Sequence, residues 1–215
     1  MSADLLTVAH PRNTALLIID MNNDFVHPDG QAARTGGRDL TASRSVIPTI
    51  VGLAADARAA GVAVIHCQHT TLPGGVGTSS AWAQARAWAT YSAPEICLKD
   101  TWGHAIIDAL APQPGDIVVH KYRYGAFTGT QLELILHSLG RDTAVCCGIS
   151  TNVCVEDTAR QAFANDMHVV LPEDACASWD MRLHAASLET ARQRYATVTT
   201  SAVLRTAWAQ QTSTT

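Results

Sequence analysis

Short apolar runs alternate with amphipathic segments along most of the chain. Continuous apolar runs of strand length are typical of buried parallel strands, and they occur at 14–19, 62–66, 116–120, 143–147 and 168–171, with an edge strand at 197–199. Between them, apolar spacing and helix-stop residues predict helices at 43–60, 102–110, 131–139, 152–165, 184–195 and 202–209. This alternation predicts an α/β fold, a parallel sheet with helices on both faces.

The least regular part of the chain follows the second predicted strand. Residues 67–91 contain a glycine-rich stretch and then a helical stretch that carries Trp82 and Trp88. A long excursion of this kind beside a strand end is usually a lid or a substrate loop. We therefore expect it to border the functional site.

Composition narrows the class of protein. The chain has 215 residues, 47% of them hydrophobic and 16% charged, which fits one globular domain. Its net charge of −4 favours neither nucleic acid nor an anionic membrane as a partner. The start lacks the features of a signal peptide and the six cysteines are sparse, so we expect a reduced, cytoplasmic protein without a disulfide scaffold.

Three reactive side chains fall at the carboxyl ends of predicted strands, where ligands bind in open α/β sheets. Asp20 follows the first strand, Lys121 the third, and Cys154 lies near the start of the helix after the fourth. A helix start favours negative charge and so a thiolate, which is the nucleophilic form of cysteine. Asp20 can accept the thiol proton, Lys121 can lower the thiol pKa, and backbone N–H groups of the turn 150–154 can stabilise an oxyanion.

Other polar residues are open to different interpretations. His66 and His69 straddle the predicted end of the second strand, and with an aspartate they could bind a metal ion, although that spacing is weak evidence. Cys146 and Cys147 lie inside an apolar strand and are expected to be packed rather than reactive. The glycine-rich stretch does not follow the GxGxxG pattern between a strand and a helix, so we expect no dinucleotide cofactor.

Three separated segments give the chain a specific resemblance. ALLIIDMNNDF, HKYRYGAFTGTQLELIL and VCCGISTNVCVEDTARQA resemble the isochorismatase-like cysteine hydrolase superfamily, over residues of about 13–204. The resemblance implies a single domain with a Rossmann-like six-stranded parallel sheet, followed here by a polar tail at 210–215. It also implies the catalytic triad Asp20, Lys121 and Cys154, a cis peptide at Ile149–Ser150, and an oxyanion hole formed by the N–H groups of Ser150 and Cys154.

Departures from the family pattern narrow the expected activity. The cysteine disfavours vinyl-ether cleavage of the isochorismatase type, and the missing Asp-x-His motif disfavours a metal-dependent nicotinamidase. Asn22 and Gly125 replace the glutamine and serine that are usual in the family. The chain looks most like ureidoacrylate and related N-carbamoyl amidohydrolases, and this similarity suggests a set of substrate-binding residues: Asn23, Phe25, Trp102, Tyr124 and Phe127.

The sequence thus predicts a cofactor-free cysteine amidohydrolase that forms a thioester with a small amide or ureido substrate and releases ammonia. Lactam hydrolysis of the streptothricin hydrolase type, a nicotinamidase-like metal-dependent amidase and a non-catalytic binding module remain as alternatives. We expect a homo-oligomer, a dimer or a tetramer, with neither nucleic acid nor membrane as a partner.

Overall fold

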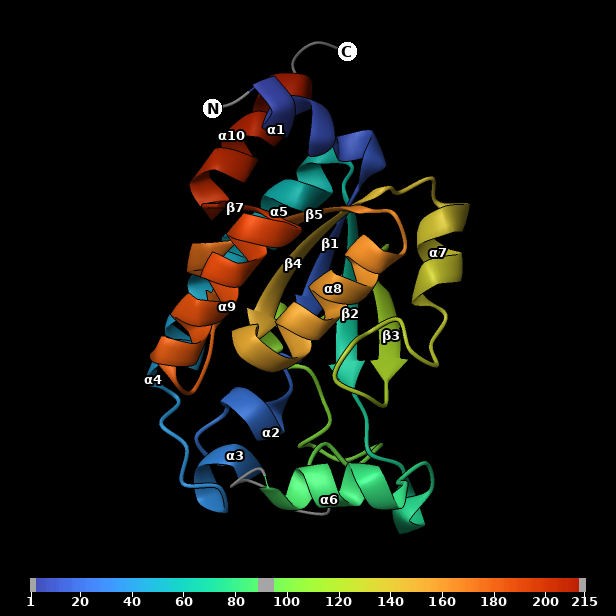
Figure 1. The fold of residues 1–215 in the computed structure, drawn as a ribbon, viewed down its shortest axis with the longest axis vertical. Helices are drawn as coiled ribbons and strands as arrows, with labels where there is room; N and C mark the ends of the chain where they lie inside the picture. Colours follow the sequence, from blue (N-terminus) through green and yellow to red (C-terminus); the bar gives the residue numbers. More distant parts are fainter. Residues whose placement is uncertain (1–2, 89–94, 213–215) are drawn as a thin grey trace.

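A computed structural model describes residues 3–88 and 95–212, and the predicted apolar runs form a parallel sheet in it (Figure 1). The sheet order is β3-β2-β1-β4-β5-β7, and the short β6 pairs with β4. The strand bounds are β1 Thr14–Ile19, β2 Ala63–His69, β3 Ile117–Lys121, β4 Thr143–Ile149, β5 His168–Pro172, β6 Cys176–Ala177 and β7 Thr197–Thr199. The α/β prediction is confirmed. Every residue of the two central strands β1 and β4 is buried, which explains their unbroken apolar sequences.

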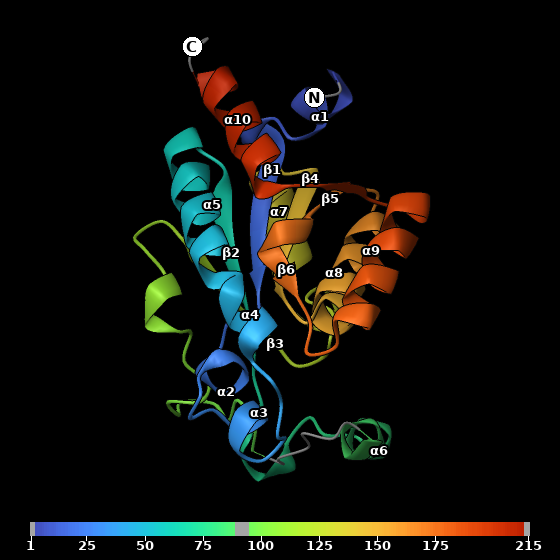
Figure 2. The ribbon, with the colours of Figure 1, turned by 90° about the vertical axis from the view of Figure 1, so that its left-hand side faces the viewer.

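Helices cover both faces of the sheet, as Figure 2 shows. On one face, α5 (Ile47–Ala60) packs against α10 (Ser201–Thr212). On the other lie α8 (Glu156–Ala164) and α9 (Met181–Arg194), with α7 (Leu132–Ser138) beside them. No helix within the described ranges is long and apolar enough to cross a bilayer.

Two predicted helices differ from the observed ones. The helix expected at 43–60 is two helices, α4 (Thr41–Ser45) and α5, because Pro48 in the first turn of α5 has no N–H to continue the ladder. The helix expected at 102–110 is wrong, since only a 3₁₀ turn at Asp108–Leu110 forms there. Its backbone instead pairs with the segment after β1: Asn23 N–H donates to Ala105 C=O, and Ile107 N–H donates to Met21 C=O.

Short helices that the sequence pattern did not reveal gather near the carboxyl ends of the strands or at the chain start. They are α1 (Ala3–Val8), α2 (Asn23–Val26) and α3 (Gln31–Arg34). The excursion after β2 contains α6 (Ser80–Trp88), and its predicted residues 89–91 lie outside the described part, as do residues 213–215 of the polar tail. Figure 1 shows α2, α3 and α6 together at the end of the sheet toward which β2 and β3 point. This end holds the candidate site.

Candidate active site

Asp20 and Lys121 form a buried ion pair at the carboxyl end of the sheet. Asp20 directly follows β1, and its N–H donates to the carbonyl of Cys67 on the neighbouring strand. Lys121 is the last residue of β3, opposite His69 of β2. Its Nζ lies 2.8 Å from Asp20 Oδ2, and the two side chains are only 0% and 1% exposed. The sequence predicted this convergence from the strand ends.

Cys154 reaches the same point from β4. The strand ends at Ile149, the peptide bond between Ile149 and Ser150 is cis as the resemblance implied, and a π-helical turn (Thr151–Val155) leads into α8. This turn replaces the regular α-helical start that the sequence predicted. Cys154 is buried, it lines the same pocket as Asp20, and the charges of Asp20 and Lys121 both act on its thiol.

Burial sets the protonation states of these groups. It raises the pKa of the Asp20 carboxyl, although the charge of Lys121 opposes the rise. Burial alone would lower the pKa of Lys121, but the nearby acidic groups, Asp20 first among them, together outweigh it and raise that pKa, so the amine stays an ammonium. Burial and the nearby Asp20 also raise the pKa of Cys154, and Lys121 opposes this.

In the free protein, burial thus opposes the thiolate that the helix start was expected to favour. Desolvation of a buried thiol outweighs the favourable effect of the helix start, and Cys154 keeps its proton at neutral pH. Asp20, within hydrogen-bonding reach, is the group that can remove this proton when a substrate arrives. The arrangement can thus perform nucleophilic attack coupled to proton transfer.

A narrow pocket opens onto the thiol. It is lined by Asp20, Phe25, Ile149, Ser150, Val153, Cys154 and Trp179. Its volume of about 10 Å³ gives room for roughly one water molecule. Phe25 lies here as predicted, 6.0 Å from the ring of Trp179. Trp179 was missed, and the signal that could have found it is its position in the loop after the fifth strand.

The other predicted substrate residues have different surroundings. Tyr124 lies close enough to the thiol for the charge of Cys154 to act on its phenol. The pKa of this phenol is raised, mainly by burial. Phe127 packs in the hydrophobic core. Asn23 uses its amide to bind the carbonyl of Trp102, whose own side chain is half exposed and lines a separate cavity. Of these four, only Tyr124 is near the thiol pocket.

The two departures from the family pattern have structural counterparts. Asn22 donates from Nδ2 to the carbonyls of His69 and His104, and so ties the end of β1 to β2 and to the excursion. Gly125 lies against the amide of Gln161, which accepts hydrogen bonds from the N–H groups of Phe127 and Thr128. A Cβ at Gly125 would meet this amide at 2.2–2.4 Å.

Replacing Gly125 with serine is expected to destabilise the loop after β3. The new Cβ would displace the Gln161 amide and break the two hydrogen bonds that it accepts from the N–H groups of Phe127 and Thr128. The expected cost is about 1–3 kcal/mol in the free energy of unfolding. Urea denaturation measures this cost. The double variant Gly125→Ser/Gln161→Ala should lose no more than Gln161→Ala alone, and an equal loss from serine in both backgrounds would contradict the steric explanation.

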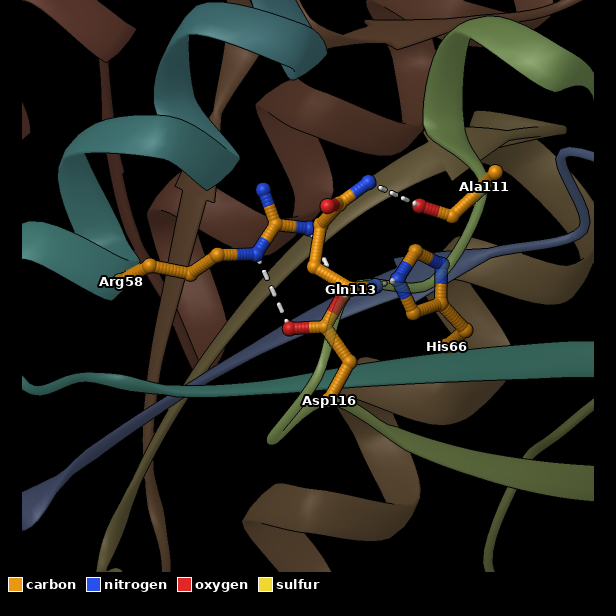
Figure 3. Close-up of polar contacts among 5 residues, drawn as sticks. All are labelled: Arg58, His66, Ala111, Gln113 and Asp116. Carbon is orange, nitrogen blue, oxygen red and sulfur yellow. Dashed lines mark hydrogen bonds and ion pairs between the residues drawn. The ribbon is translucent and has the colours of Figure 1, made fainter.

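The structure does not bring His66 and His69 together for metal binding. Both lie within β2, three residues apart, so their side chains point to opposite faces of the sheet. His66 Nε2 lies 3.1 Å from Asp116 Oδ2, and Arg58 forms two hydrogen bonds to the same carboxylate, as Figure 3 shows. His69 faces the ring of Phe25. Across residues 3–88 and 95–212, no three side chains of histidine, cysteine, aspartate or glutamate are placed to share a metal ion.

Comparison with known proteins decides the family. A profile of the isochorismatase domain matches residues 14–203. The chain belongs to the isochorismatase family. Within this family, it is 39% identical to the ureidoacrylate amidohydrolase RutB of Azorhizobium caulinodans over 172 aligned residues, and the aligned region covers 75% of each chain. The resemblance inferred from the three sequence segments is therefore confirmed.

Solved structures of the isochorismatase family share the fold. A cysteine hydrolase from Pseudomonas syringae superposes with a TM-score of 0.81 at 28% identity and covers 94% of each chain. The N-carbamoylsarcosine amidase of Thermoplasma acidophilum superposes with a TM-score of 0.71 at 26% identity, over 88% of this chain and 96% of that one.

Proposed function

We propose that the protein is a cysteine-dependent amidohydrolase that cleaves a carbon–nitrogen bond of a small ureido or amide substrate and releases ammonia. The observation that carries this proposal is the Cys154 thiol, which lies beside the buried Asp20–Lys121 pair and lines the same pocket as Asp20. Membership of the isochorismatase family and relatives named for ureidoacrylate and N-carbamoylsarcosine support the class of substrate, because both names denote a urea group.

The first half of the reaction forms a thioester. Asp20 accepts the proton of Cys154 as Sγ attacks the carbonyl carbon of the substrate. The N–H groups of Ser150 and Cys154 stabilise the oxyanion of the tetrahedral intermediate. Asp20 then returns the proton to the leaving nitrogen, the carbon–nitrogen bond breaks, and ammonia departs. Lys121 remains an ammonium throughout and holds Asp20 in place.

The second half hydrolyses the thioester. Asp20 takes a proton from a water molecule that attacks the same carbonyl carbon, and the carbon–sulfur bond breaks as Sγ recovers a proton. An amide substrate yields a carboxylic acid. A ureido substrate yields a carbamic acid, which decomposes to an amine and carbon dioxide. Nothing is oxidised or reduced in either half.

A substrate panel tests the proposal. Ammonia release is measured for ureido acids, N-carbamoyl amino acids, biuret and simple primary amides, each with and without a chelator. We expect one class to release ammonia in amounts equal to the substrate consumed, unaffected by the chelator. Loss of activity with chelator would restore the metal-dependent alternative, and ring opening of a lactam without ammonia would favour the streptothricin hydrolase type.

A further inference from the structure

A second cavity lies beside the thiol pocket, between the end of β2, the excursion that follows it and the loop after β3. Its wall includes His69, Trp82, Arg86, Tyr122 and Arg123. In this structure its volume is about 20 Å³. Helix α6, which carries Trp82 and Arg86, buries none of its own side chains, so the wall that it forms can move outward at little cost.

Two residues join this cavity to the thiol pocket. The backbone of His69 lies near the Asp20 carboxylate and lowers its pKa, and the His69 ring lies 5.7 Å from that of Phe25, which lines the thiol pocket. The ring of Tyr124 lies 4.6 Å from that of Trp82, and its phenol is close enough to Cys154 for the two charges to interact. The second cavity and the thiol pocket are therefore neighbours, with the contact between His69 and Phe25 lying between them.

The second cavity is strongly cationic. The Arg123 guanidinium donates to the carbonyls of Tyr122 and Gly77, and it lies 5.1 Å from the centre of the Trp82 ring. The charges of Lys121, Arg86 and Arg123 all act on the imidazole of His69. An anion in this cavity would gain from charge-assisted hydrogen bonds to two guanidinium groups.

His69 provides an independent indication of a ligand. Its side chain is 5% exposed, and its Nδ1 atom has no hydrogen-bond partner among the described residues. Burial, together with the surrounding positive charges, holds the pKa of this imidazole well below its ordinary value, so the ring is neutral. A buried polar atom without a partner costs free energy, and a ligand that supplies the partner recovers that cost.

We propose that Arg86, Arg123 and His69 form a subsite for the carboxylate of a ureido acid whose urea group lies at Cys154. This inference rests on the proposed function, and it adds that the substrate is an acid rather than a neutral amide. Arg86 and Arg123 bind the carboxylate oxygens, and the aromatic rings of Trp82 and Tyr124 cover the chain between the two ends of the substrate.

A pair of substrates that differ only in charge tests the subsite. For 3-ureidopropionate and its methyl ester, kcat/KM should favour the acid by about 50-fold, the value of one or two charge-assisted hydrogen bonds. In Arg86→Gln or Arg123→Gln this preference should fall to within about 5-fold of unity, mainly through KM for the acid. Arg34→Gln, which changes an exposed arginine on α3, is the matched control and should keep the preference.

Alkylation separates failure of the subsite from failure of the proposed function, because it requires no hydrolysis. N-Iodoacetyl-β-alanine carries its carboxylate at the far end of a chain about as long as a ureido acid, and its methyl ester is the neutral counterpart. The ratio of their rates at Cys154, measured by mass spectrometry of the adduct, should fall about 10-fold in Arg86→Gln and stay unchanged in Arg34→Gln.

Two results overturn the subsite. One is an acid-to-ester preference in hydrolysis that survives in both arginine variants, and the other is an acid-to-ester ratio of alkylation rates that is unchanged in both variants. If neither ureido compound is hydrolysed but the alkylation ratio depends on Arg86 or Arg123, the anion subsite stands and the proposed function fails for these substrates. If the acid and the ester are hydrolysed equally well and the ratio of alkylation rates is the same in wild type and in both arginine variants, the proposed function stands and the subsite fails.

Discussion

Replacing Cys154 with alanine is expected to reduce ammonia release by at least about 10⁴-fold, because the nucleophile that splits the reaction into two steps is gone. The fold should survive. The side chain is small, the hydrogen bond from Thr158 Oγ1 to the carbonyl of Cys154 does not depend on the thiol, and removal of a buried thiol costs about 1 kcal/mol of unfolding free energy. Steady-state kinetics and thermal unfolding measure the two effects.

Cys147→Ala is the matched control for this experiment. Cys147 is a buried cysteine on β4, the strand that leads to Cys154, but burial raises its pKa well above the ordinary value and it contacts no catalytic group named above. We expect the ammonia release of the Cys147→Ala variant to stay within about 3-fold of wild type. If the Cys154→Ala variant retained more than about 1% of the wild-type activity, another nucleophile would be required and the mechanism would be refuted.

Replacing Lys121 with methionine is expected to cost about 3–5 kcal/mol of unfolding free energy near neutral pH, because Asp20 is left as an unpaired buried charge. Activity should fall about 10³-fold, because the pKa values of Asp20 and Cys154 both rise without the ammonium: a larger fraction of Asp20 is already protonated, and the thiolate formed during attack is less stabilised. Urea denaturation and ammonia release measure these losses. The pH profile of the rate of Cys154 alkylation should also shift to higher pH, because Lys121 lowers the thiol pKa in the wild-type protein.

The pH dependence of the stability loss identifies its cause. Without Lys121, burial raises the folded-state pKa of Asp20 further above its unfolded value. Such a group costs nothing below its unfolded pKa, and stability is lost as pH rises through the folded pKa, so the deficit should be smaller at about pH 5 than at about pH 8. The double variant Asp20→Asn/Lys121→Met has no charge to bury. Its stability relative to wild type should depend less on pH, and an equal dependence in both variants would contradict this account.

The sheet and the triad could be predicted because local pattern determines both. Apolar runs such as Thr14–Ile19 reflect burial on both faces of a strand, and parallel strands bring their carboxyl ends to one edge. The convergence of Asp20 and Lys121 follows from those two facts. The ion pair between them required only that the predicted strands lie in one sheet.

The pocket could not be predicted, because long-range contacts decide it. The apolar spacing of 102–110 is typical of a helix, yet its backbone pairs with the segment after β1 and Trp102 points elsewhere. The pocket at Cys154 is lined by Phe25 of α2 and by Trp179, which come from parts of the chain far from Cys154 in sequence. Arg86 lies on α6, which buries none of its side chains, so no apolar face in the sequence predicts which way Arg86 points.

The positions of the triad and of the proposed subsite in the fold have a consequence for evolutionary divergence. Asp20, Lys121 and Cys154 lie on or directly beside the sheet, whereas Trp82 and Arg86 lie on the excursion between β2 and β3. Asp24 holds this excursion from the sheet side, since its carboxylate accepts a hydrogen bond from the N–H of Cys97. A descendant gene that keeps Asp24 and exchanges the segment around α6 can acquire a new substrate while its bond-breaking chemistry is inherited unchanged.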